Sequence, residues 1–136
     1  MSKKTEKAIE LFNNGYNCAQ AAYLATRNEM PDVSEEAAAR MSAAFGGGVG
    51  GLGHTCGAVC GAVMALGEVL YPAPNGPEEE KSAARAAMRN LGLAFEKEFG
   101  SCMCADLKDT APAREDGLKP CTAYVEWCVE QAEKLL

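Results

Sequence analysis

The stretch at residues 46–67, GGGVGGLGHTCGAVCGAVMALG, decides the fold of this chain. Its first half is a glycine-rich loop, in which the main chain can take conformations that side chains forbid. Its second half is apolar on nearly every side, which is typical of a helix that is buried all round. We therefore predict a buried central helix over residues 56–70, preceded by the glycine loop and capped at its N-terminus by Thr55.

One face of this central helix has almost no side chain. Gly57, Gly61 and Ala65 repeat every four residues and so lie on the same side of the helix. A neighbouring helix can approach closely along that side. The composition also favours packed helices, because the chain has one isoleucine and seven valines against abundant alanine.

The remaining chain shows further helical patterns separated by turn signals, and it shows no strand pattern. Asn17 and Gln20 form a capping-box pair at the start of one helix, and Ser34 precedes two glutamates at the start of another. We predict an all-α, single-domain bundle of five or six helices over residues 1–136. The helices are expected near residues 5–13, 18–28, 34–45, 56–70, 77–99 and from 120 onward, with a short helical turn at 102–107.

The net charge excludes some classes of partner. The chain carries a formal charge of -6 and has no cluster of basic residues, which argues against nucleic acid and anionic membranes. No stretch approaches the roughly 20 apolar residues that a membrane span needs. The N-terminus lacks the continuous apolar segment of a secretory signal, so we expect a cytoplasmic protein.

Seven cysteines in a reducing compartment need an explanation other than a disulfide framework. Five of the seven fall at predicted helix starts. A helix start presents unpaired N–H groups and a partial positive charge, which favour a thiolate over a thiol. Thiolates attack disulfides and bind soft metals. These five candidate residues are Cys18, Cys56, Cys102, Cys104 and Cys121.

The other two cysteines and the single histidine have plainer interpretations. Cys60 and Cys128 lie inside predicted helices on apolar faces, where cysteine often acts as a small hydrophobic residue. His54 is expected on the surface or in the loop. A nucleophilic pair between His54 and Cys56, or a metal-ligand role for His54, remains an alternative. Cys102 is either a spare ligand or a bystander.

The glycine loop contains a formal G-x-G-x-x-G at residues 48–53. A dinucleotide fingerprint requires a strand before the loop and a βαβ unit around it. Here a helix precedes the loop, so we interpret the match as coincidental. The loop amides and the following helix start can still hold a small anion or a cluster sulfide.

Four separated blocks of sequence resemble a known family. They are GYNCAQAA, GHTCGAVCGAVMALG, FGSCMCADL and CTAYVEWC, and they are similar to the redox-active family named for its pattern C_GCAxxG_C_C. The resemblance covers nearly the whole chain. In the second block the cysteine precedes the glycine instead of standing within GCA. The resemblance implies that the shared cysteines are Cys18, Cys56, Cys104 and Cys121, and that the additional ones are Cys60, Cys102 and Cys128.

Three functional classes follow from these cysteines. In the first, a dithiol/disulfide protein, Cys56 is the attacking sulfur and Cys18 or Cys121 is its partner. In the second, the four shared cysteines bind an iron–sulfur cluster or another thiophilic metal, and the chain is an electron carrier or sensor. In the third, the chain is a helical interaction module. The expected partner is a redox protein or a small-molecule oxidant or reductant.

Overall fold

The computed structural model describes residues 1–28, 32–71 and 77–136, and the side chains of residues 77–81 are not described. The described residues form seven α-helices, one short 3-10 helix and no strand, which confirms the all-α class. There is one helix more than expected, because the short turn after Ser101 extends into a helix of its own. The helices are α1 Lys3–Asn13, α2 Cys18–Thr26, α3 Glu35–Ser42, η1 Ala43–Phe45, α4 Gly57–Leu70, α5 Pro77–Phe99, α6 Cys104–Thr110 and α7 Thr122–Lys134.

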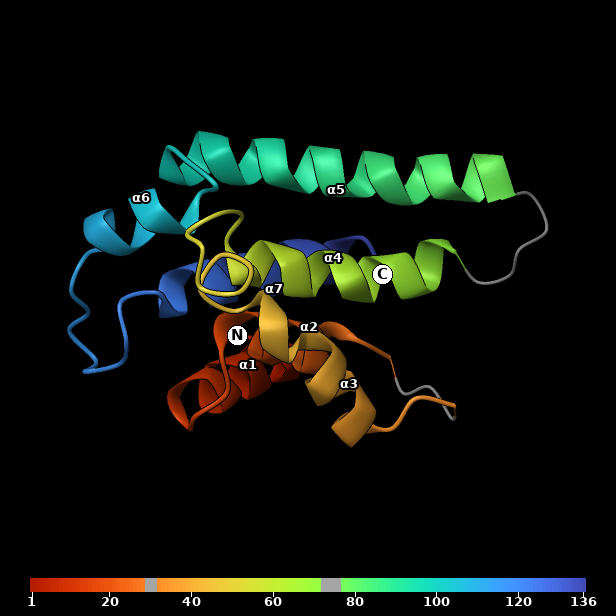
Figure 1. The fold of residues 1–136 in the computed structure, drawn as a ribbon. Coiled ribbons are helices and arrows are strands. Elements are labelled where there is room, and N and C mark those ends of the chain that lie inside the picture. The colour runs from red at the N-terminus through yellow and green to blue at the C-terminus, as the bar shows by residue number, and fades with distance from the viewer. Residues whose placement is uncertain (29–31, 72–76) are drawn as a thin grey trace.

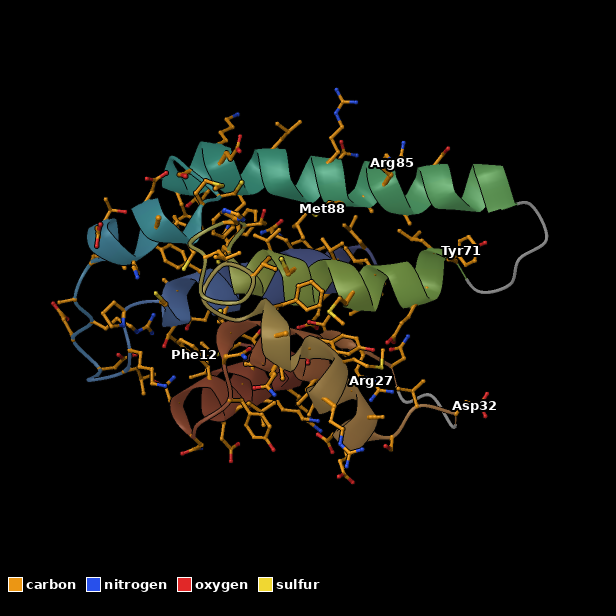
Figure 2. All side chains as sticks on the ribbon, in the orientation of Figure 1. Phe12, Arg27, Asp32, Tyr71, Arg85 and Met88 are labelled. Carbon is orange, nitrogen blue, oxygen red and sulfur yellow. The ribbon has the colours of Figure 1, made fainter. Side chains whose placement is uncertain are left out.

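Helix α4 is the centre of the fold, as the sequence predicts. It runs beside α7 through the middle of the molecule, with α5 across one side and α1, α2 and α3 on the other (Figure 1). Most of its buried apolar residues belong to one cluster that also includes side chains of the neighbouring helices, whereas Ala65 belongs to a second, smaller cluster. Phe12 of α1 and Met88 of α5 contact the larger cluster from opposite sides (Figure 2).

The face of α4 without side chains packs against α2, and this is the most extensive contact between the described helices. A Cβ built on Gly61 would lie 2.9 Å from the Tyr23 nitrogen and 3.0 Å from the Ala22 Cβ, and it would also collide with the Ala19 carbonyl. These distances are too short for real Cβ contacts. The predicted close approach is therefore confirmed, and α2 is the helix that makes it.

The helix starts are largely as predicted. The Asn17 side chain accepts a hydrogen bond from the Gln20 amide and the Gln20 side chain accepts one from the Asn17 amide, which is the predicted capping box. Ser34 caps α3 through the amide of Ala37. The prediction that Thr55 caps the central helix is wrong by one position, because Cys56 is the N-cap residue and α4 begins at Gly57.

An aromatic cluster fixes the end of α5 on the bundle. Phe95 and Phe99 contact the rings of Tyr124 and Trp127 of α7, with centroid distances between 4.9 and 5.8 Å. Edge-to-face contacts of this kind add to the free energy gained by burial. The cluster therefore holds the chain that follows α5, residues 100–104, close to the start of α4. None of the described helices is long and apolar enough to cross a membrane.

Two glycines of α4 allow a matched test of the helix contact. We expect Gly61→Ala to destabilise the protein by about 1–2 kcal/mol, because the clash with α2 exceeds the gain in helix propensity. Gly67→Ala is the control, since a Cβ at Gly67 meets nothing within 4 Å. It should stabilise the protein by about 0.5–1 kcal/mol. Urea unfolding measures the free energy of unfolding of both variants. Equal changes in this free energy would contradict the described contact.

Candidate functional site

Four cysteines stand at the N-terminal ends of four different helices. Cys18 is the first residue of α2 and Cys104 is the first residue of α6. Cys56 and Cys121 are the N-cap residues of α4 and α7. The predicted placement of these four at helix starts is therefore confirmed, although α7 begins two residues later than the predicted Pro120. The same prediction is wrong for Cys102, which lies two residues before α6, ahead of the N-cap residue Met103.

The structure brings these four helix starts together, with Cys18 in the middle. The Cys18 sulfur lies against Gly57, where any Cβ would collide with it. Burial raises the pKa of Cys56 and of Cys121 most, and the charges that Cys18 and Cys104 would carry raise both further. The charge of Cys104 also raises the pKa of Cys18, after the larger effect of burial. Cys18 and Cys104 therefore each lie within electrostatic range of the other three sulfurs.

The glycine loop, residues 46–53, covers this site with an unusual backbone. Gly47, Gly48, Val49, Gly50 and Gly51 have φ between 64° and 74°, a left-handed region that favours glycine. The amides of residues 49–54 donate to carbonyls of residues 44–49. Six amides that we expected to be available to an anion are therefore used inside the loop. The Gly47 amide instead acts on Cys18, whose pKa it lowers against the larger rise caused by burial.

Asn17 joins the glycine loop to the start of α2. Its side-chain amide donates to the Ala43 carbonyl at 2.8 Å, and a Cβ on Gly46 would lie 2.6 Å from the Asn17 Cγ. On the other side of the loop, a Cβ on Gly48 would lie 2.6 Å from the Cys104 Cβ. The loop therefore passes between the starts of α2 and α6, and only glycine fits at both contacts.

A short antiparallel bridge joins the residue before Cys56 to the residue before α6, and no pattern in the sequence predicts it. Thr55 pairs with Met103. The Cys56 amide donates to the Cys102 carbonyl at 2.7 Å, and the Cys104 amide donates to the His54 carbonyl at 2.6 Å. This register places Cys56 directly opposite Cys102. The backbone of Cys102 is therefore part of the frame that holds Cys56.

Burial determines the thiol pKa values at this site. The pKa of Cys56 is raised to about 12, first by burial and then by Cys18, and burial also raises the pKa of Cys18 and Cys121. Backbone amides lower the pKa of Cys18 and Cys56, as expected at helix starts, but their effect is smaller. The expectation that helix starts give net thiolates is therefore wrong for Cys18, Cys56 and Cys121.

The remaining sequence candidates lie around this site. Cys128 is fully buried in the core, as predicted, and burial raises its pKa. Cys60 is half-buried one turn into α4, and its thiol lies 3.9 Å from the Thr55 carbonyl. His54 is exposed, which agrees with the expected loop position.

Metal binding was an expectation for the four shared cysteines. Within the part of the chain that is described, no three side chains of His, Cys, Asp or Glu are arranged to hold a metal ion. The thiols of all seven cysteines are free, with no disulfide. The four cysteines form a cluster of neighbouring thiols.

Comparison with known proteins gives one family. The family model described as "Putative redox-active protein (C_GCAxxG_C_C)" matches residues 16–135. A protein of Archaeoglobus fulgidus described as "Uncharacterized protein" is 35% identical over 63 residues, which are 46% of this chain and 42% of that protein. The chain therefore spans less than half the length of this relative. No solved structure matches the chain significantly.

A pair of loop glycines tests the contact with α6. Gly48→Ala and Gly50→Ala both place a side chain at positive φ, which costs about 1–2 kcal/mol at either position. Only the Gly48 Cβ would meet Cys104, because nothing lies within 4 Å of a Cβ at Gly50. We expect Gly48→Ala to destabilise the protein by about 1–3 kcal/mol more than Gly50→Ala. Denaturant unfolding of both variants checks this, and equal losses would refute the contact.

Proposed function

Because this chain belongs to the family described as "Putative redox-active protein (C_GCAxxG_C_C)", we propose that it carries two electrons as a reversible disulfide. Cys18 and Cys56 are the pair that forms this disulfide. The oxidant or reductant is an external disulfide or dithiol, on a partner protein or a small molecule. The chemistry requires a compartment in which the resting thiols stay reduced, and this favours the cytoplasm.

The position of the Cys18 sulfur is the observation that carries this proposal. This sulfur packs against Gly57, the residue directly after Cys56 in the chain. Among the charges that raise the pKa of Cys56, that of Cys18 has the largest effect. A disulfide needs two cysteines whose backbones are close and whose side chains point toward each other. Gly57 removes the side chain that would otherwise separate these two cysteines.

The structure also favours different roles within the pair from those that the sequence suggested. We expected Cys56 to be the sulfur that attacks the external disulfide, but Cys56 is 5% exposed and burial raises its pKa to about 12. The amides of Gly47 and Ala19 lower the pKa of Cys18, against the larger effect of burial, which raises it. These amides stabilise the negative charge that develops when Cys18 attacks a sulfur, whereas Cys56 is the inner sulfur of the pair.

Cys104 and Cys121 surround this pair. Both lie within electrostatic range of Cys18, and Lys108 lowers the pKa of Cys121. In this proposal, Cys104 and Cys121 place further thiols beside the disulfide. Either of them is an alternative to Cys56 for disulfide formation with Cys18. An iron–sulfur cluster bound by all four thiols is the competing function, and it requires the helix starts to move into a common ligand set.

A redox titration tests the proposal. Protein purified without oxygen is equilibrated with dithiothreitol at different ratios of reduced to oxidised form, and its free thiols are counted. We expect two of the seven thiols to disappear in one reversible two-electron transition. Cys18→Ser and Cys56→Ser should each abolish the transition, because each removes one sulfur of the pair. Cys128→Ala is the control and should retain it, since Cys128 lies in the core.

The same preparation separates the two functions. Bound iron and sulfide with visible absorption, lost together in Cys18→Ser and Cys56→Ser, would favour the cluster and overturn the disulfide. A colourless, iron-free protein that shows the reversible two-electron transition would support the disulfide. Persistence of the transition in both serine variants would contradict the assigned pair.

A further inference from the structure

The segment between α5 and α6 places one additional cysteine at the edge of the site. Cys102 lies directly opposite Cys56 across the antiparallel bridge, with its carbonyl accepting the Cys56 amide at 2.7 Å. Successive residues of an extended segment point to opposite sides. The burial agrees, since Met103 is 39% exposed while Cys102 and Cys104 are half-buried. Cys102 and Cys104 therefore face the same side of the segment.

The Cys102 thiol also reaches the surface of the molecule. It donates a hydrogen bond to the Glu96 carboxylate at 3.2 Å, and this contact is exposed. Glu96 is on the exposed side of α5, one turn before its end. In contrast, Cys56 is buried. Cys102 therefore lies between the solvent and the buried Cys56. Its backbone is hydrogen-bonded to Cys56, and its thiol lies beside a surface carboxylate.

We propose that Cys102 is the cysteine that meets the external disulfide, and that Glu96 makes this entry selective for cationic over anionic disulfides. The inference rests on the proposed function, because it describes how electrons leave the Cys18–Cys56 pair. Cys102 is outside the four cysteines that the family resemblance identifies. It serves here as a relay between the partner and the buried pair.

The relay consists of three thiol–disulfide exchanges. Cys102 attacks the external disulfide, forms a mixed disulfide and releases one external thiol. Cys56 then attacks the Cys102 sulfur, which releases the second external thiol and leaves a Cys56–Cys102 disulfide. Cys18 finally attacks the Cys56 sulfur, forms the Cys18–Cys56 disulfide and frees Cys102. Each step breaks one S–S bond, forms another and passes a proton to the leaving sulfur, so the external disulfide gains two electrons.

The charge around Cys102 gives the selectivity. The Glu96 carboxylate is in direct contact with the thiol. A carboxylate in contact with the attacking thiol repels an anionic reagent and attracts a cationic one, and salt weakens the effect. The whole chain, with a net charge of -6, acts in the same direction.

Two methanethiosulfonate reagents of opposite charge provide the probes. The trimethylammonium-ethyl and sulfonato-ethyl forms each convert a thiol to a mixed disulfide and release methanesulfinate. Fully reduced, full-length protein is treated with less than one equivalent of either reagent, and peptide mass spectrometry locates the first label. We expect Cys102 to carry it. Cys102→Ser should slow the first labelling about tenfold or more, while Cys60→Ser, which removes another half-buried additional cysteine, should leave the rate unchanged.

Glu96→Gln isolates the charge effect. Any change in the reactivity of the Cys102 thiol alters both rates alike, so the ratio of cationic to anionic rates reports the neighbouring charge alone. Relative to the ratio with free cysteine, we expect a several-fold preference for the cationic reagent, reduced in Glu96→Gln and at high salt.

The outcomes separate this inference from the proposed function. A first label on another cysteine, or a wild-type rate in Cys102→Ser, overturns the relay while leaving the Cys18–Cys56 transition intact. A rate ratio that Glu96→Gln does not change overturns the selectivity. A protein whose thiols show no reversible transition overturns the relay together with the proposed function.

Discussion

The structure depends on the close approach of α2 to the first half of α4. This approach is possible because Gly57 and Gly61 have no side chain, so the backbone of α2 lies where a Cβ would stand. Close packing of this kind leaves little room for adjustment, so even one added methyl group strains the helices. The contact also places the start of α2 beside the start of α4, and so brings Cys18 next to Cys56. The same glycines therefore determine both the fold and the position of the candidate redox pair.

The site shows two opposing physical effects on the thiols. Helix starts and the Gly47 amide favour a thiolate at Cys18, whereas burial and neighbouring sulfurs favour a thiol. Burial is the stronger effect at Cys18, Cys56 and Cys121. At these three cysteines burial therefore favours the protonated thiol. In such a cluster, reaction depends on which thiol is reached first and on which amides stabilise the charge during attack, and these are properties of geometry.

Local signals in the sequence were enough to predict the helices and the placement of four cysteines at their starts. The capping box at Asn17 and the four-residue repeat of small residues in α4 need only neighbouring residues, so they can be recognised without a structure. The bridge between Thr55 and Met103 joins segments far apart in the chain and consists of backbone hydrogen bonds, which leave no pattern in the side chains. The role of Cys102 was missed for this reason.

The relative effects of backbone amides and of burial on the thiol pKa values could not be predicted from the sequence either. The helix-start position of Cys56 is visible in the sequence, but its burial depends on how the loop, α6 and α7 cover it. For the same reason, the six loop amides that bond within the loop could not be distinguished from amides available to a ligand.

Disulfide mapping tests the central claim most directly. The reduced protein is oxidised in solution with a mild disulfide, alkylated and digested, and the linked peptides are identified by mass spectrometry. The account predicts one principal link, between the peptides that contain Cys18 and Cys56. A principal link that leaves Cys18 unpaired, or that joins Cys60 to Cys128, would contradict it.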